Sequence, residues 1–276
     1  MTILLIELET KGHHLSSYLR SIVTELVKNK KKIIFLTTKE IKKNNFYSFF
    51  NKYTKIIYIN KIKYPLKKNY FSFLKFQITN YKIIKKKFQQ IKKKNNIDHI
   101  YVNTLDFLDK PLSIFGSPFG DTKFSGLYLN PKFYIQYKSL LNNLVKNKLY
   151  IFLFEKLLQI NSLSNIFIVD PLCSQFLSKR AKINYQKIKF INELGSSNKI
   201  EKFNLSIQKC RKILKISKND FVILIYGFIR KNKSLDELFK VVQYIKTKKP
   251  IKILIVGKRD IETQLFLKNT YRKNKN

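Results

Sequence analysis

The sequence has no long hydrophobic run and little cysteine. Its longest unbroken apolar stretch, residues 221–229, is far shorter than the roughly 18 residues that would suggest a membrane span. The first residues run directly into an apolar strand, with no basic region and no small-residue cleavage site, so we expect no export. The two cysteines, Cys173 and Cys210, lack the paired spacing of a disulfide or metal motif. These absences predict a reducing compartment and a cytoplasmic location.

Acidic residues are also scarce. The 276 residues include 56 Lys and Arg but 17 Asp and Glu, which gives a formal net charge of +39. A surface potential of this size attracts polyanions at low salt. Three explanations remain open: the codon bias of an AT-rich genome, a basic surface that faces an anionic membrane, and nucleic-acid binding. The sequence has no zinc-finger, helix-turn-helix or RNA-binding signature, so we expect no specific nucleic-acid partner.

Strands and helices alternate along the chain. Hydrophobic residues make up 44% of the sequence and aromatic residues 14%, enough to form the core of one large domain or two smaller ones. Apolar runs predict strands at 3–8, 33–36, 55–59, 97–102, 166–169, 188–191, 221–226 and 251–256. Helical spacing predicts helices that begin near residues 15, 73, 133, 171, 234 and 260. This order predicts parallel sheets with right-handed crossovers, and therefore Rossmann-like α/β domains.

We expect an N-terminal domain at residues 1–195, a linker at 196–219 and a partial C-terminal domain at 220–276. From residue 220 onward the sequence predicts two strands and about two helices, too little for an independent Rossmann core. Residues 105–130 are expected to form a long irregular loop, because they include Pro111, Gly116, Pro118, Gly120 and Gly126. Such a loop inside an α/β domain is more often functional than filler, although a structural loop is the alternative.

The passage after the strand at 221–226 has the pattern of an anion site. Gly227 ends the strand, and a short basic loop with Arg230 and Lys233 follows. Ser234 and Glu237 have the spacing of a capping box at the start of a helix. A helix N-terminus has free N–H groups and a partial positive charge, which attract phosphate. Arginine is scarce in this chain, which favours a role for Arg230. The alternative is that both cations are ordinary solvated side chains.

This passage, with the strand that ends at Gly257, resembles the start of the donor domain of retaining GT-B glycosyltransferases, the glycosyl transferases group 1 family. In that family a Gly-x-x-(basic)-x-x-Lys loop holds the diphosphate of a nucleotide sugar. Gly227, Arg230 and Lys233 match this loop, and Ser234 stands where the family usually has glycine. The resemblance implies an α/β, GT-B-like fold, with an N-terminal Rossmann-like domain and an incomplete second Rossmann-like domain.

The loop at residues 8–14 is similar to the first loop of the family, which is often Gly-Gly-His. Gly12 would let the backbone approach a sugar phosphate, or it serves a tight turn. His13 and His14 follow the end of a parallel strand, where α/β sheets bind ligands, and would bind hydroxyls or pack locally. Asn103 is expected to face the same cleft from the next strand end. His99, inside that strand, is expected to be structural.

The resemblance implies transfer of a sugar from a nucleotide-sugar donor to a glycan or lipid-linked acceptor in cell-surface polysaccharide synthesis. Arg230, Lys233 and the helix N-terminus would stabilise the charge that develops on the leaving diphosphate. The sequence has no Asp-x-Asp motif, Walker loop or metal-ligand cluster, so we expect no metal and no cofactor other than the donor. The donor and the acceptor are the expected partners, with peripheral contact at the anionic inner face of the membrane.

The C-terminus differs from the family pattern. The donor domain of the family continues to a Glu-x7-Glu segment that binds the sugar and the ribose, whereas this chain ends at Asn276. Two expectations follow: a truncated gene whose product is inactive alone, or a second polypeptide that supplies the rest. A non-catalytic basic protein that binds a membrane surface or polyanions is the alternative interpretation.

Overall fold

The computed structural model describes residues 1–10, 15–60, 64–65, 70–129, 144–178, 185–191, 206–229 and 234–273. The chain divides into two compact units, Met1–Ile200 and Glu201–Asn276, which we call the N-terminal unit and the C-terminal unit. The range predicted as a linker, 196–219, contains helix α8 (Ile207–Ile213), which belongs to the C-terminal unit. The Ser206 side chain caps this helix by accepting a hydrogen bond from the backbone N–H of Lys209 at 3.2 Å.

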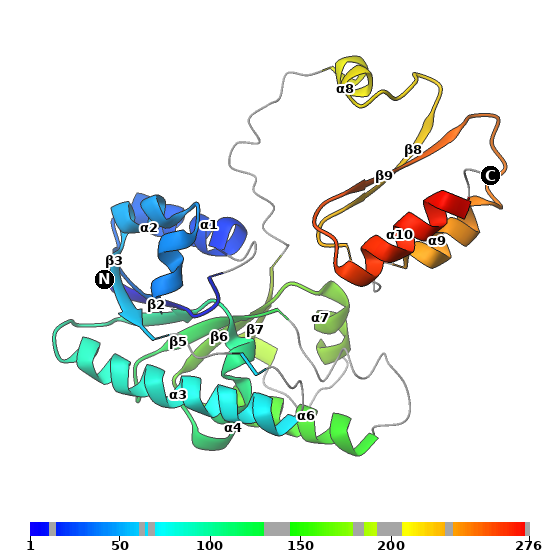
Figure 1. The fold of residues 1–276 in the computed structure, drawn as a ribbon. Helices are drawn as coiled ribbons and strands as arrows, with labels where there is room; N and C mark the ends of the chain where they lie inside the picture. Colours follow the sequence, from blue (N-terminus) through cyan, green and yellow to red (C-terminus); the bar gives the residue numbers. More distant parts are fainter. Residues whose placement is uncertain are drawn as a thin grey trace. The chain divides into compact units, whose positions relative to one another are not determined.

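Seven parallel strands form the sheet of the N-terminal unit, in the order β3-β2-β1-β4-β5-β6-β7 (Figure 1). They are β1 (Thr2–Glu7), β2 (Lys32–Thr38), β3 (Lys55–Ile59), β4 (His99–Val102), β5 (Phe124–Tyr128), β6 (Leu163–Ile168) and β7 (Ile188–Phe190). The chain adds β2 and β3 on one side of β1 and then returns to add β4 on the other side. The strand order therefore reverses between β1 and β4, the position where open α/β sheets bind ligands.

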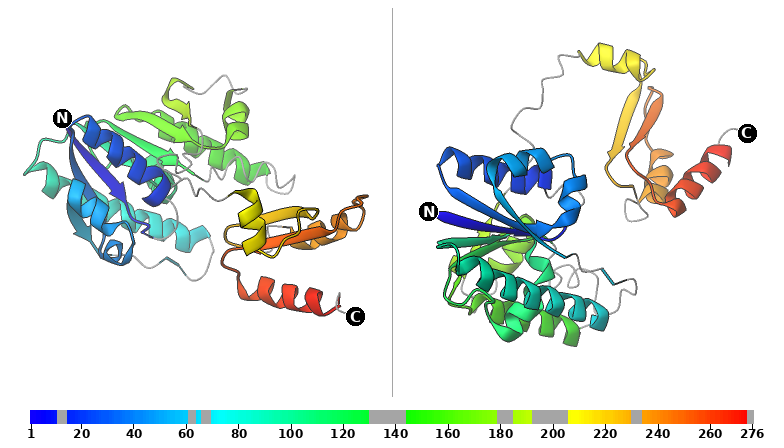
Figure 2. Two further views of the ribbon diagram at one scale, coloured as in Figure 1. Left: turned by 90° about the horizontal axis from the view of Figure 1, so that it is seen from above. Right: turned by 60° about the vertical axis from the view of Figure 1, so that its left-hand side comes forward.

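Helices cover both faces of this sheet (Figure 2). One face is covered by the π-helix η1 (Leu15–Leu19), α1 (Arg20–Lys28), the 3-10 helix η2 (Lys39–Lys43) and α2 (Tyr47–Tyr53). The other face is covered by α3 (Tyr70–Lys92), the 3-10 helix η3 (Leu105–Phe107), α4 (Asp109–Phe115), α6 (Leu144–Leu158) and α7 (Pro171–Ser178). The 3-10 helix η4 (Tyr185–Lys187) precedes β7. Among the residues described, no helix is long and apolar enough to cross a membrane.

Alternate residues of the central strands enter two separate cores. In β1, Leu4 and Ile6 pack on the side of α3, whereas Ile3 and Leu5 pack on the side of α1 and α2. Both faces of β1 are buried, which explains its continuous apolar run. The helix predicted to begin near residue 73 is confirmed as α3, whose residues Tyr81, Ile84, Phe88 and Ile91 are buried at helical spacing on one face.

The prediction of an irregular loop at residues 105–130 was wrong. The stretch contains η3, α4 and β5, and all five residues of β5 are buried between β4 and β6. Gly126 allows close packing inside this strand, since a Cβ there would lie 3.0 Å from Leu105 Cδ1 and 3.2 Å from the Val102 carbonyl oxygen. Pro111 lies in the first turn of α4, where a missing N–H costs no helical hydrogen bond. Glycine and proline therefore serve packing and a helix start here.

The C-terminal unit pairs two parallel strands, β8 (Phe221–Tyr226) and β9 (Ile251–Val256). Helix α9 (Leu235–Val242) connects them, and α10 (Ile261–Lys273) follows β9. Asp260 starts α10 as predicted, because its Oδ1 accepts a hydrogen bond from the Thr263 N–H at 2.9 Å. The capping box predicted at Ser234 was wrong. Ser234 has a left-handed backbone (φ 49°) and makes no side-chain cap, whereas a capping side chain reaches the first turn from an extended backbone.

Candidate functional site

Polar side chains gather where the strand order reverses, at the carboxyl ends of β2, β1 and β4. Glu7 is the last residue of β1 and pairs in register with Thr37 of β2. Asn103 directly follows β4, and its backbone N–H donates to the carbonyl oxygen of Ile6 at 2.9 Å. Glu7 and Thr37 lie two residues after Leu5 and Phe35, which belong to the core under α1 and α2, so their side chains lie on that same face of the sheet. The three side chains thus form a buried polar row across three adjacent strands.

The Glu7 carboxylate accepts three hydrogen bonds. Its Oε2 accepts from Asn103 Nδ2 at 2.5 Å and from Thr104 Oγ1 at 2.7 Å. Its Oε1 accepts from the backbone N–H of Glu9 at 2.8 Å. One side chain therefore ties the end of β4 to the loop that leaves β1.

The environment of Glu7 makes its charge sensitive to pH. Its side chain is only 1% exposed, and burial raises the pKa of the Glu7 carboxyl to about 7, although the hydrogen bonds from Thr104, Asn103 and Glu9 oppose this shift. At neutral pH the group is divided between its neutral and ionised forms. Since it is buried, Glu7 would influence a ligand by orienting its neighbours. Within the described part of the chain, Thr37 Oγ1 and Asn103 Oδ1 have no hydrogen-bond partner. These two oxygen atoms could therefore still form hydrogen bonds.

The loop predicted to bind sugar begins at this row. Its described start is held from two directions, since Glu9 donates to Glu7 and Asn44 Nδ2 donates to the Thr10 carbonyl oxygen at 3.0 Å. Gly12, His13 and His14 lie outside the described residues, so their roles stay predictions. Sequence reasoning missed Glu7. The available signal was a single acidic residue at the end of an otherwise apolar strand.

Asn103 was expected to face the cleft, and the structure buries its side chain at the end of β4. Its side chain is 0% exposed and points to Glu7, so it positions that carboxylate. A direct contact between Asn103 and a sugar stays a prediction. His99 lies at the start of β4 with its Nε2 at 3.1 Å from Ser125 Oγ, and burial lowers the pKa of its imidazole.

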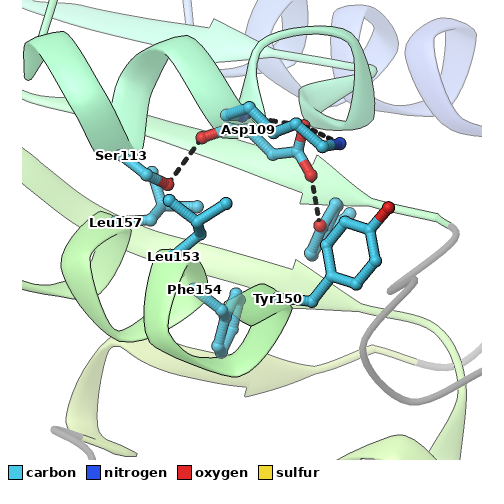
Figure 3. A pocket seen from close by; sticks show the side chains of 8 residues that line it. Asp109, Ser113, Tyr150, Leu153, Phe154 and Leu157 are labelled. Atoms are coloured by element: carbon cyan, nitrogen blue, oxygen red, sulfur yellow. Dashed lines mark hydrogen bonds and ion pairs between the residues drawn. The ribbon is translucent and has the colours of Figure 1, made fainter. Parts of the chain in front are cut away.

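A second polar cluster surrounds Asp109 at the start of α4, on the opposite face of the sheet (Figure 3). Asp109 Oδ2 accepts from the Tyr128 hydroxyl at 2.7 Å, and Oδ1 accepts from Gln77 Nε2 at 2.6 Å and from the Lys110 N–H at 2.8 Å. Burial and then the Asp109 charge raise the pKa of Tyr128, which keeps its hydroxyl a donor. Sequence reasoning missed this cluster, because its members are far apart in the chain.

Lys110 completes the cluster as a buried cation. Its Nζ lies 3.7 Å from Asp109 Oδ1 and between 5.3 and 5.9 Å from the ring centroids of Tyr70, Phe73 and Tyr150. The cavity beside it has a volume of about 10 Å³, room for no more than one water. The arrangement therefore joins α3, α4, β5 and α6, and does not form a ligand site.

In the C-terminal unit, two glycines bring the carboxyl ends of β8 and β9 together. Gly227 has φ 108° and Gly257 has φ 134°. A Cβ on Gly257 would lie 1.9 Å from the Gly227 carbonyl oxygen, so only glycine fits there. The Gly227 N–H donates to the Val256 carbonyl oxygen at 3.0 Å, and the Ile229 N–H donates to the Lys258 carbonyl oxygen at 2.8 Å. The loop predicted to hold a diphosphate is therefore fixed at its start.

The rest of that loop gives a mixed electrostatic picture. Arg230 and Lys233 lie outside the described residues, so their phosphate contacts stay predictions. The first turn of α9 contains two carboxylates, Asp236 and Glu237. Negative side chains at this end interact with the helix dipole and offset its attraction for another anion. Binding of a diphosphate at α9 therefore needs the cations of the loop.

No protein-family model matches the chain, and no curated protein matches it in sequence. Solved structures do match. Sucrose-phosphate synthase from Thermosynechococcus elongatus matches with a TM-score of 0.62 and 13% identity, over 99% of this chain and 67% of that chain. HepE from Anabaena, in complex with UDP and glucose, matches with a TM-score of 0.53 and 14% identity, over 99% of this chain and 65% of HepE. A glycosyltransferase from Rickettsia africae matches with a TM-score of 0.49 and 17% identity, over 99% of this chain and 64% of the Rickettsia chain.

The chain has a GT-B fold. The α/β, Rossmann-like architecture expected from the sequence is thereby confirmed, in the seven-stranded sheet and in the match to sucrose-phosphate synthase and HepE. The chain spans about two thirds of the length of sucrose-phosphate synthase and slightly less than two thirds of the length of HepE and of the Rickettsia protein.

Proposed function

We propose that the chain is a glycosyltransferase that transfers a sugar from a nucleotide-sugar donor to a glycan or lipid-linked acceptor in cell-surface polysaccharide synthesis. The observation that carries this proposal is the GT-B fold over 99% of the chain, shared with HepE, whose structure contains UDP and glucose. The strand ends of the C-terminal unit support it. Apart from its two chain neighbours, no described residue has an atom within 4 Å of the position of a Cβ on Gly227, which leaves this backbone accessible on the described side.

Each unit has one role in this proposal. The donor diphosphate binds at Gly227, Arg230 and Lys233, and these cations stabilise the charge on the leaving group without a metal or cofactor. In the N-terminal unit, the loop with Gly12, His13 and His14 contacts the sugar or the acceptor. Glu7 and Asn103 hold the start of that loop by the hydrogen bonds described above. We assign no catalytic base.

The proposed place of action is the anionic inner face of the membrane. The net charge of +39 supports this placement, because anionic lipids attract basic proteins over a distance of about one Debye length. A lipid-linked acceptor would be reached there.

The test is thermal unfolding of the purified chain with a panel of UDP-, GDP- and ADP-sugars at moderate salt. One nucleotide class should raise the melting temperature, and the shift should grow with ligand concentration. Arg230→Ala with Lys233→Ala should abolish the shift. The matched control is Lys246→Ala with Lys249→Ala, two exposed cations just before β9, at the opposite end of the strands. The control should retain the shift.

Other outcomes contradict the proposal. If no donor stabilises the chain, or if added salt removes every shift, the chain has no specific donor site. If both double variants reduce the shift equally, attraction by the net charge explains the binding. The alternative, a non-catalytic basic protein that binds polyanions or a membrane surface, would then account for these results.

A further inference from the structure

Strand β3 lies at the edge of the N-terminal sheet, with no further described strand next to it (Figure 1). A basic groove lies beside β3. We call it the lysine groove and define it by Lys39, Asn60, Lys86, Lys87 and Gln90. Its volume is about 470 Å³, within the range of small-molecule sites. Lys39 directly follows β2 and Asn60 directly follows β3, so the carboxyl ends of two strands form one wall.

The other wall is one face of α3. Ile83, Lys86, Lys87 and Gln90 are spaced as i, i+3, i+4 and i+7, which places them on the same side of a helix. Ile83 and the buried Ile59 also line the groove and add apolar surface to that of the lysines and amides.

The charges in this groove are all of one sign. Ion pairs among the described residues join Lys28 to Glu25 and Lys110 to Asp109, and include none of the groove lysines. Lys42 adds a further cation nearby, with its Nζ 5.3 Å from the ring centroid of Tyr58, another residue of the groove wall. Low-dielectric walls concentrate the potential of like charges in a concave site. An anion placed there would relieve their mutual repulsion.

Lys39, Lys86 and Lys87 line a common groove, although Lys39 and Lys86 are exposed like other lysines of the chain. Lys82 and Lys85 of α3 are exposed and do not line the groove. In the groove, by contrast, the side-chain amides of Asn60 and Gln90 accompany the ammonium groups. Ammonium groups bind phosphate, and amides donate to and accept from hydroxyls. Phosphate, hydroxyls and an apolar face occur together in a phosphorylated sugar.

We propose that the lysine groove binds a phosphorylated carbohydrate, with its phosphate at Lys39, Lys86 and Lys87 and its hydroxyls at Asn60 and Gln90. The identification of this ligand as the acceptor rests on the proposed function. The proposal that the groove binds it does not. The same chemistry occurs in a soluble sugar phosphate and in the headgroup of a phosphoinositide-type lipid.

The test measures binding of glucose 6-phosphate to the full chain by calorimetry at moderate salt, with glucose and inorganic phosphate for comparison. Glucose 6-phosphate should bind more tightly than either. Lys86→Gln with Lys87→Gln should weaken it about tenfold or more, because two charge-assisted contacts are lost. The control, Lys82→Gln with Lys85→Gln, removes the same charge from the same helix and should change the affinity by less than about twofold. Asn60→Ala with Gln90→Ala should reduce the preference over inorganic phosphate.

A second arm identifies the source of the ligand. Vesicles that contain phosphatidylinositol are compared with vesicles of equal charge that contain phosphatidylserine. A preference for phosphatidylinositol that the groove variant loses indicates a lipid headgroup, and binding of glucose 6-phosphate without this preference indicates a soluble ligand. Circular dichroism verifies that each variant is folded.

The proposal is overturned if both lysine pairs weaken binding equally, or if neither glucose 6-phosphate nor phosphatidylinositol vesicles are preferred. Stabilisation by nucleotide sugars is measured in parallel and should be unchanged in the groove variant. If the wild-type chain lacks that stabilisation but retains groove binding, the proposed function fails and the lysine groove stands.

Discussion

Strands β1 and β8 have similar apolar sequences and very different burial. In β1 (Thr2–Glu7) every residue after the first is buried, whereas β8 (Phe221–Tyr226) has no buried residue and three exposed ones. β1 pairs with β2 and β4 and has helices on both faces, while β8 pairs with β9 alone among the described strands. An apolar run thus predicts a strand, but the number of neighbours determines how much its burial stabilises the fold.

Leucine truncation in the two strands tests this comparison with the largest expected effect. Leu5 of β1 is 0% exposed and Leu224 of β8 is 57% exposed. Leu5→Ala should lower the free energy of unfolding by about 2–5 kcal/mol, because it removes buried contacts and leaves a cavity. Leu224→Ala should lower it by less than about 1 kcal/mol, since its side chain is already largely hydrated. Urea unfolding followed by far-UV circular dichroism measures both.

Equal losses in the two variants would contradict the comparison. They would mean that Leu224 is covered in solution, by another copy of the chain or by another molecule. Repeating the unfolding of Leu224→Ala and wild type at several protein concentrations separates these cases, because the stability of a self-associated state depends on concentration.

The strand ends differ as well, and Glu7→Gln tests this difference. The C-terminal unit has glycines at its strand ends, whereas the N-terminal unit buries a carboxyl group. Burial raises the pKa of Glu7 from 4.5 to about 7, so the folded state binds more protons than the unfolded state between these values. Stability should therefore fall as pH rises from about 4.5 to about 7 and then level off, with a total on the order of 3 kcal/mol.

The glutamine variant cannot ionise and should lose this part of the pH dependence. Relative to wild type, Glu7→Gln should become more stable as pH rises from 5 to 8, measured by urea unfolding at each pH. Glu25→Gln, at an exposed pair with Lys28, controls for the loss of one negative charge. Parallel stability curves for wild type and Glu7→Gln would show that Glu7 does not titrate in this range.

The sequence predicted the elements whose signals are local. Buried parallel strands are continuous apolar runs, and the buried face of α3 follows from its spacing, so both were predictable. Strand β5 was missed because Ser125 and Gly126 resemble a loop, and the reason for Gly126 is a contact with Leu105 that only the fold creates. Ser234 had the spacing of a cap, but spacing does not reveal a left-handed backbone.

The candidate site divides in the same way. Asn103 was predicted from its place after a strand, which is a local signal. Its contact with Glu7 joins residues 96 positions apart, so neither the burial of the carboxyl nor its raised pKa could be read from the sequence. The cluster around Asp109 depends on Gln77 and Tyr128, which are 32 and 19 positions away.

The smallest expected effect concerns Lys110, a lysine that is buried beside the covered sheet of the N-terminal unit. Its Nζ has no hydrogen-bond partner among the described residues and lies 3.7 Å from Asp109, which retains three donors of its own. Lys110→Met keeps the packing between the surrounding rings and should change the free energy of unfolding by about 1 kcal/mol or less, because the Asp109 carboxylate keeps its three hydrogen-bond donors when the ammonium group is removed. Lys110→Ala should cost more, because it leaves a cavity. Loss of one partner of a buried ion pair can lower the free energy of unfolding by about 3 kcal/mol or more. If Lys110→Met has an effect of that size, the charge of Lys110 contributes more to the stability of this unit than its packing does.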